Sequence, residues 1–401
     1  MAQFLFFMFF VLKPFYIFPS GRLGLADICL LCCFAALMGE LIPKGRKYSA
    51  FFRQQMDWLL FLFISCVIVI NGIYTSLLGS GDFIRASLFW IYNGLAVWCF
   101  VRLGEGKNFE KWLCTGIKIN LTLQILILLS GRGRLFYEPW GGTRYMGTFN
   151  DPNQMAFFIF CMVLLLYLYG KRGKGVFYIL SSILIWKTKS TGAFLGVLVF
   201  AVALSIRKLS RIVTPCKSRR IFIVLITIGA LCIAGVLFLA VTPGEAAVGR
   251  DSFTVFQRIQ EKMGKMKGEG LEGLIFDRGW EKMLLYPGFL LFGAGEGGYE
   301  RFLLAQQVNE IHSSLFSVLF CYGAAPTILL LVWIDKQLKS LNGWMWPAVL
   351  ALLTESFFLV NYRQPIFWMI LLTGRIYMVN AKNKYKHAVT DQIIRKAGIE
   401  E

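Results

Sequence analysis

Long apolar segments recur along the whole sequence and restrict its possible folds more than any other feature. A helix that crosses a bilayer needs about 20 mostly apolar residues, and irregular backbone is not tolerated in contact with lipid. We therefore predict an all-α polytopic membrane protein with about twelve transmembrane helices. The predicted spans are 2–18, 24–42, 58–78, 83–103, 111–130, 149–169, 175–186, 190–206, 221–241, 311–334, 343–360 and 365–380.

Three of these spans deviate from a regular apolar helix. The first is interrupted by Lys13 and Pro14, and the seventh is short and is expected to form a hairpin with the eighth. The twelfth is also short and contains Arg375, whose long side chain can extend to the membrane surface. No positively charged region precedes the first apolar segment, so we expect no cleaved signal peptide.

The composition agrees with a membrane location. Hydrophobic residues make up 57% of the chain and charged residues 16%, whereas a soluble domain carries about 25% charged residues. This balance excludes a soluble enzyme, a disordered chain and a coiled coil. Most of the cysteines lie in apolar stretches, and none stands with a histidine at zinc-ligand spacing. We interpret them as small apolar residues that form neither a metal site nor a disulfide framework.

The net charge of +19 indicates the orientation of the spans rather than nucleic-acid binding. Lys and Arg collect in cytoplasmic loops, and with the N-terminus inside they concentrate in every second loop and in the tail. Both termini are therefore predicted to lie in the cytoplasm. The predicted domains are helices 1–9 over 1–241, an outer loop over 242–310, helices 10–12 over 311–380, and a basic cytoplasmic tail over 381–401.

The segment 242–310 is polar and much longer than the other loops, and the alternation of loops places it outside the membrane. Residues 253–266 carry apolar residues at helical spacing, which fits a helix lying on the membrane surface. Pro287, Gly288 and the glycine-rich run 293–298 are expected to end a second helix and form a turn. Loops of this length in a compact protein are usually lids or binding loops.

Cationic residues on the outer side run against the usual preference of loops and are the first candidates for a binding site. Arginine offers a planar fork of donors that matches a phosphate group, and it stays charged at any relevant pH. Any one of these residues is more simply a solvated charge, but as a cluster they predict anion binding. The cluster comprises Arg132, Arg134, Arg144, Lys187, Lys189, Arg250, Arg258, Arg278 and Arg301.

A polar motif opens the sixth span. Pro152 sits where a first-turn proline belongs, and Asn150 or Asp151 is the expected helix cap. Capping does not account for Asn153 and Gln154, because amides that enter hydrocarbon need polar partners in a cavity or bundle.

His312, one of two histidines, stands at the outer entrance of the tenth span. A neutral imidazole there can take a proton from an attacking hydroxyl; the simpler interpretation is an interfacial histidine bonded to a backbone carbonyl. Inside the spans, Lys118 is expected to reach an interface and Glu355 to pair with a polar neighbour. No close pair of outward-facing carboxylates forms a metal-binding pattern, so we expect no essential divalent ion and no cofactor.

Three motifs, taken in order, resemble the O-antigen ligase/polymerase superfamily. They are residues 147–154, the Arg278-Gly279-Trp280 sequence followed by the run 292–299, and His312 at the start of the next span. Members of this family are multispanning bacterial glycosyltransferases of the GT-C type with a large periplasmic loop between two late spans. The resemblance covers most of the chain by topology and a smaller part by local motif.

The resemblance implies a donor glycan linked to undecaprenyl diphosphate, used without nucleotide sugar or metal. It implies that Arg278 contacts the donor diphosphate and that His312 stands near the reacting hydroxyl. The other expected substrate-binding residues are Arg258, Arg144, Lys189, Asn150, Asn153, Gln154, Trp280 and Arg301. Two positions depart from the family pattern: Lys189-Ser190-Thr191-Gly192 stands where Ser-Arg-Gly is usual, and Ser313 follows the histidine where Asn is common.

The expected function is polymerisation of lipid-linked repeat units into O-antigen, capsular or exopolysaccharide. The site would face the periplasm from the bacterial cytoplasmic (inner) membrane. An alternative is a ligase that transfers the glycan to lipid A-core. A less favoured one is a flippase or transporter in which Lys118 and Glu355 form a coupling pair. The expected partners are the lipid-linked oligosaccharide, the bilayer, and a chain-length regulator and flippase of the same pathway; no nucleic acid is expected.

Overall fold

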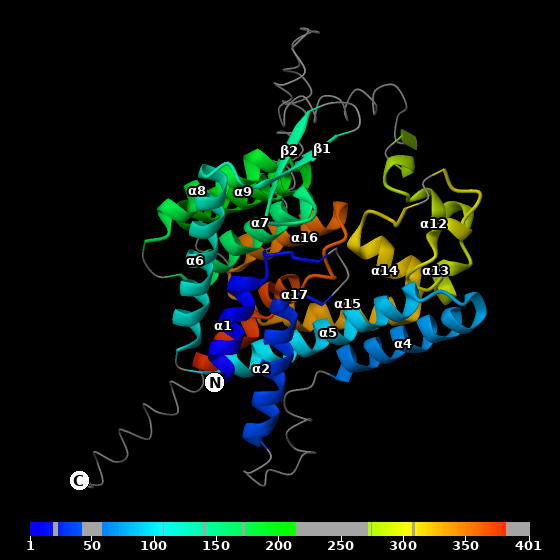
Figure 1. Ribbon diagram of the computed structural model, residues 1–401. Coiled ribbons are helices and arrows are strands. Elements are labelled where there is room, and N and C mark those ends of the chain that lie inside the picture. Colours follow the sequence, from blue (N-terminus) through cyan, green and yellow to red (C-terminus); the bar gives the residue numbers. More distant parts are fainter. Residues whose placement is uncertain are drawn as a thin grey trace.

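The computed structural model describes residues 1–18, 23–41, 58–106, 108–138, 142–170, 173–213, 272–273, 275–306 and 309–381 (Figure 1). These residues are mostly helical, and five of their helices are long and apolar enough to cross a membrane. The five are α4 (Trp58–Leu78), α5 (Asp82–Gly104), α6 (Phe109–Leu129), α7 (Pro152–Tyr169) and α9 (Thr191–Val213). This agrees with the predicted polytopic helical membrane protein.

Shorter helices occupy the other predicted spans within the described ranges. They are α1 (Ala2–Leu12), α2 (Leu25–Leu41), α8 (Gly175–Thr188), α14 (Ser314–Tyr322), α15 (Ala324–Lys339), α16 (Trp346–Phe358) and α17 (Pro365–Leu371). The predicted span 221–241, the predicted surface helix 253–266 and residues 382–401 of the tail lie outside the described residues. The number of twelve spans therefore stays a prediction.

Helix α7 lies at the centre of the bundle, and α4 lies at its edge (Figure 1). In α7, 83% of the apolar window is buried inside the protein, whereas the corresponding share in α4 is 22%. A helix that is apolar all round is expected to be surrounded by other helices, and α7 packs against α6, α8, α9, α16 and α17. Helix α7 is therefore held by neighbours from both halves of the chain.

The first helix ends at Leu12, directly before the predicted interruption at Lys13 and Pro14. Lys13 forms an ion pair with Asp27 at the start of α2, with 3.0 Å between Nζ and Oδ1. The Pro14 carbonyl accepts a hydrogen bond of 2.7 Å from the Thr148 hydroxyl just before α7. The break between Leu12 and the next segment is thus bonded to the starts of α2 and α7. These bonds satisfy its polar groups, which would otherwise lie unpaired in an apolar environment.

The predicted span 311–334 is not one continuous helix, which corrects that expectation. It divides into α14 and α15 at Gly323, whose φ is +78°. A Cβ at this position would lie 2.4 Å from the carbonyl oxygen of Leu291. The break leaves the carbonyls at the end of α14 available to other donors, and those of Phe320 and Cys321 accept hydrogen bonds from the amides of Ala294 (2.9 Å) and Gly295 (2.8 Å).

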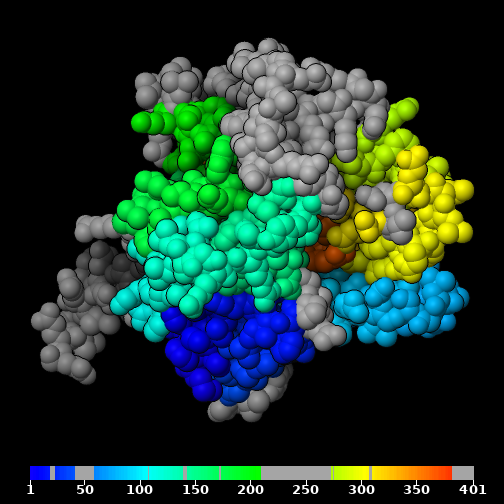
Figure 2. All heavy atoms as spheres, turned by 45° about the horizontal axis from the view of Figure 1, so that its top comes forward, coloured from blue at the N-terminus to red at the C-terminus, as the bar shows by residue number. Residues whose placement is uncertain are grey.

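The broken helix therefore holds the glycine-rich turn. Around this turn lie the short helices α12 (Glu281–Leu285) and α13 (Phe289–Phe292) and the 3-10 helix η3 (Tyr299–Arg301). The Tyr74 hydroxyl of α4 donates a hydrogen bond of 3.0 Å to the carbonyl of Gly293. Figure 2 shows this segment, in yellow, resting on the end of α4 and α5, in light blue.

A two-stranded antiparallel hairpin, which the sequence analysis did not predict, precedes α7. Strand β1 (Arg134–Tyr137) pairs with β2 (Thr143–Gly147). Its strands are too short to be recognised as a membrane span, and the apolar and aromatic residues Leu135, Phe136 and Tyr137 of β1 are a weak sequence signal for a strand.

Residues that were predicted to share one side of the membrane contact one another in the fold. At the predicted inner end, the Asn380 amide donates to the Gly104 carbonyl at 2.9 Å, and the Arg207 guanidinium donates to the Tyr167 hydroxyl at 2.8 Å. At the other end lie the hairpin, the glycine-rich turn and the starts of α7, α9 and α14. The grouping agrees with the predicted alternation, while the assignment of this end to the outside stays a prediction.

Candidate functional site

Arg278 and His312 lie side by side, although they are far apart within the predicted loop and span. The His312 backbone amide donates a hydrogen bond of 2.9 Å to the Arg278 carbonyl. The Arg278 guanidinium donates to the carbonyl of Phe358, the last residue of α16, at 2.7 Å, and its carbon lies 6.0 Å from the centre of the Phe358 ring. A cation at the carboxyl end of a helix is stabilised by the helix dipole, and both side chains remain half-buried.

Trp280 packs beside this pair. Its ring meets Phe316 edge-on, with 4.9 Å between ring centres, and lies 5.8 Å from the ring centre of Phe357. The indole nitrogen Nε1 is buried and has no hydrogen-bond partner in the described part of the chain. A buried donor without a partner is unfavourable, so a ligand oxygen that reached this N–H would satisfy it.

Arg144 is almost completely buried, with 4% of its surface exposed. Its guanidinium donates to the Thr188 carbonyl at 2.8 Å, to the Asn153 side-chain oxygen at 2.7 Å and to the Glu138 carboxylate at 3.3 Å. Arg144 therefore ties the hairpin to α7 and to the turn between α8 and α9. Its role in substrate binding stays a prediction, and the Glu138 carboxylate already balances its charge.

The motif that opens α7 is folded as a cap. The Asp151 carboxylate accepts hydrogen bonds from the amides of Asn153 (2.8 Å) and Gln154 (3.0 Å), as expected for one of the two predicted capping residues. Asn150 donates to the carbonyl of Phe18 at 2.9 Å. The side-chain oxygen of Gln154 is buried and has no hydrogen-bond partner among the described residues.

Lys189 ends α8 in the left-handed conformation, with φ of 51° and ψ of 32°. This strained backbone is rare for a residue with a side chain, and it reverses the chain between α8 and α9. Three residues later, a Cβ at Gly192 would lie 2.6 Å from the Leu359 side chain just beyond α16. The turn that carries Lys189 therefore abuts the same end of α16 that receives Arg278.

The predicted residues thus fall into two groups joined through the end of α16. One group contains Arg278, His312 and Trp280, and the other surrounds Arg144 and Lys189. Arg258 lies outside the described residues.

Arg301 belongs to neither group. Its guanidinium donates to the carbonyls of Gly297, at 2.9 Å, and Ala294 within the glycine-rich turn. It also faces the Phe302 ring, with 4.6 Å between the guanidinium carbon and the ring centre. Burial lowers the pKa of Arg301. These contacts give the side chain a structural role in holding the turn.

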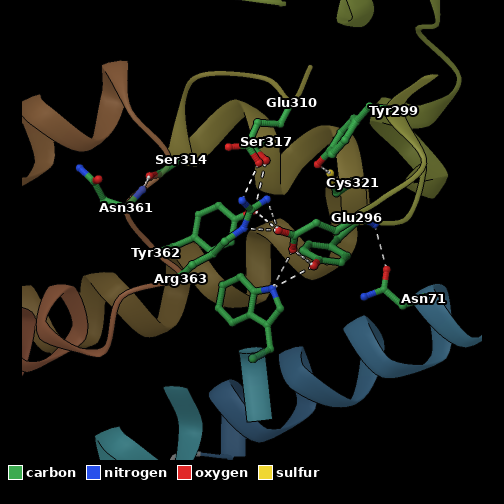
Figure 3. A network of polar contacts seen from close by, with 12 residues as sticks. Asn71, Glu296, Tyr299, Glu310, Ser314, Ser317, Cys321, Asn361, Tyr362 and Arg363 are labelled. Atoms are coloured by element: carbon green, nitrogen blue, oxygen red, sulfur yellow. Dashed lines mark hydrogen bonds and ion pairs between the residues drawn. The ribbon is translucent and has the colours of Figure 1, made fainter. Parts of the chain in front are cut away.

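Glu296 is the centre of a polar network that the sequence analysis missed (Figure 3). It is 3% exposed, and its carboxylate accepts hydrogen bonds from Tyr362 (2.8 Å), Tyr322 and Trp90 (3.3 Å). The Arg363 Nε donates to the same carboxylate at 2.7 Å. In the sequence, Glu296 is a single acidic residue in a run of six residues of which four are glycine. Its role becomes apparent only from its contacts with distant segments.

The charges of this network determine the pKa of Glu296. Burial alone would raise it, but the Arg363 guanidinium and the hydrogen bonds from Tyr322, Tyr362 and Arg363 hold it below the ordinary value of a glutamate. Arg363 forms a second ion pair with Glu310, with 2.5 Å between the nitrogen and oxygen atoms. Glu310 is two residues before His312, so the network extends to the candidate site.

Lys118 and Glu355 do not form the pair considered for a transporter. The Lys118 ammonium lies over the Phe177 ring, 5.6 Å from its centre. Glu355 is completely buried beside Gly192 of α9, and its carboxyl oxygens have no hydrogen-bond partner in the described part of the chain. Within that part, no group of three or more His, Cys, Asp and Glu side chains is placed to hold a metal ion.

No protein-family model matches this chain, and no curated protein matches it either. The structure therefore supplies the physical argument for a function.

Proposed function

We propose that this protein is a membrane glycosyltransferase that polymerises repeat units linked to undecaprenyl diphosphate. The observation that carries the proposal is the adjacency of Arg278 and His312 at the end of α16. A backbone hydrogen bond of 2.9 Å joins the two residues there, and both of their side chains are half-buried.

The proposed reaction needs two kinds of group. An acceptor hydroxyl attacks the anomeric carbon of the donor sugar, and the bond from that carbon to the diphosphate oxygen breaks with its electron pair leaving on the diphosphate. Negative charge therefore grows at the leaving oxygen, where cations and donors stabilise it most. Arg278 and the Trp280 N–H would serve this purpose, and the His312 imidazole would accept the proton of the attacking hydroxyl.

The supporting observations concern the surroundings of these residues. The starts of α9 and α14 lie on the same side of the bundle, and helix N-termini favour anions. Lys189 in the turn before α9 adds a cation near this end. The proposed outer position of the site follows from the predicted alternation of loops, and the proposed bacterial cytoplasmic membrane follows from the resemblance to the O-antigen ligase/polymerase superfamily.

A purified-enzyme assay tests the proposal. The protein in detergent is given lipid-linked repeat units, and the products are separated by gel electrophoresis. We expect elongation without a membrane gradient, and a loss of about 10²–10³ in rate for Arg278→Ala, which is typical for one well-placed donor. Arg85→Ala is the matched control, because Arg85 is exposed on the same predicted side and its guanidinium forms an ion pair with Asp82 three residues earlier on the same helix.

A deletion strain distinguishes polymerase from ligase. Loss of a polymerase leaves core bearing a single repeat unit, whereas loss of a ligase leaves bare core while lipid-linked chains accumulate. An inert mixture in detergent, together with unchanged polymer in the Arg278→Ala and His312→Ala strains, would contradict the proposed enzyme.

A further inference from the structure

The segment that carries His312 is held at both of its ends by one turn of the chain. This turn, residues 359–363, joins α16 to α17. Glu310 pairs with Arg363 at 2.5 Å on one side of His312. On the other side, the Ser314 hydroxyl donates to the Leu359 carbonyl at 2.7 Å and accepts from the Asn361 amide at 2.9 Å (Figure 3).

Arg363 is itself held in place by the Glu296 network. Its guanidinium binds the buried carboxylate of Glu296, which also accepts hydrogen bonds from Tyr362, Tyr322 and Trp90. Only part of the Arg363 side chain, 28%, is exposed. A charged group held by several short contacts cannot adopt many positions, so the Glu310 carboxylate meets a partner that is already ordered.

Between the two attachment points, the chain has little freedom. The Ser313 side chain caps α14 by accepting a hydrogen bond of 3.4 Å from Phe316, and the His312 amide is bonded to Arg278. Ile311 is completely buried. The imidazole therefore projects from a short segment whose neighbours on both sides are anchored, which is what a proton-accepting group requires to keep its geometry.

We propose that Arg363 is the positioning residue for His312 and acts by holding Glu310. The role as a proton acceptor rests on the proposed function, but the positioning of the segment does not. Arg363 does not need to touch the substrate, because its contribution is made through the 310–314 segment. Glu310 is the residue to substitute, because it contacts Arg363 and is not one of the residues bonded to the buried Glu296 carboxylate.

Chemical modification of His312 tests the positioning directly. The chain has two histidines, so diethylpyrocarbonate labelling followed by peptide mass spectrometry reports His312, with His387 as the reference in the same digest. At about pH 8 a free imidazole is mostly neutral, and the labelling rate then reports access and freedom of motion. The full-length protein in detergent is used throughout.

Glu310→Gln is expected to raise the His312 labelling rate about fivefold, which corresponds to about 1 kcal/mol at 1.4 kcal/mol per factor of ten. Ser314→Ala, which removes the opposite attachment, is expected to raise it as well. Glu300→Gln is the control, because Glu300 is an exposed carboxylate of the same loop. A labelling rate in Glu310→Gln equal to that of the control would overturn the inference, whatever the enzymatic activity.

A double-mutant comparison separates positioning from general stability. If Glu310 acts through His312, Glu310→Gln slows elongation in the wild-type background and has no further effect in His312→Ala. Equal factors in both backgrounds would contradict the inference. Absence of any elongation by the wild type would instead contradict the proposed function, and the labelling result would stand independently.

Discussion

Replacing Glu296 with glutamine is expected to destabilise the fold far more than the same change at an exposed glutamate nearby. The substitution keeps the size of the side chain but removes its negative charge, which balances Arg363. It also replaces one oxygen of the carboxylate that accepts three other hydrogen bonds. Breaking a buried ion pair costs about 3–5 kcal/mol. Arg363 keeps Glu310 as a partner and is partly exposed, so we expect about 3 kcal/mol, at the low end of that range.

The assay is thermal unfolding of the purified protein in detergent. For a chain of 401 residues, about 3 kcal/mol corresponds to a decrease of about 4 °C in the midpoint temperature. Glu300→Gln is the control and is expected to stay within about 0.5 kcal/mol of the wild type. If Glu296→Gln unfolds at the same temperature as Glu300→Gln, the buried network does not stabilise the protein and the reasoning is wrong.

The pH dependence gives a second check on the same residue. The pKa of Glu296 is lowered in the folded protein, so its stabilising effect is present above the ordinary pKa of glutamate, about 4.3. That effect is lost as the pH falls through the lowered value. The difference between wild type and Glu296→Gln is therefore expected to be constant near neutral pH and to shrink below about pH 4.

Three further substitutions test other parts of the structure. Gly323→Ala places a side chain on a backbone with positive φ and against the Leu291 carbonyl, so we expect the free energy of unfolding to fall by about 3 kcal/mol. Gly343→Ala is the control and should leave it unchanged, because a Cβ there meets open space. Glu355→Leu is expected to leave the unfolding midpoint unchanged or raise it, since the carboxyl has no hydrogen-bond partner in the described chain; a decrease would reveal a partner. Trp280→Phe keeps an aromatic ring but removes the five-membered ring of the indole with its N–H, so we expect a small decrease in the unfolding midpoint and elongation that is slower by about tenfold or more. Elongation at the wild-type rate would exclude this donor from the site.

Much of the helical architecture follows from the sequence because its physical cause is local. An apolar run must be helical in lipid, whatever its neighbours are, and the predicted bounds of α4, α5 and α6 differ from the observed bounds by only a residue or two. The interruption at Lys13 and Pro14 was predictable for the same reason. The cap at Asp151 also depends only on adjacent residues.

The break at Gly323 and the Glu296 network were not predictable in this way, because both depend on contacts between distant segments. Gly323 looks like an ordinary glycine in an apolar run until Leu291 packs against it. The partners of the Glu296 carboxylate come from α5, α14 and the turn before α17, which are distant from it in the sequence. The pairing of Arg278 with His312 lies between these cases: the sequence indicated both residues, and only the fold brings them together.

The most direct test of the proposed function is a density map of the protein with an undecaprenyl-diphosphate-linked repeat unit bound. The account predicts that the diphosphate lies against the Arg278 guanidinium, with the donor sugar on the His312 side. A diphosphate bound at the opposite end of the bundle, beside Gly104 and Tyr167, would contradict it.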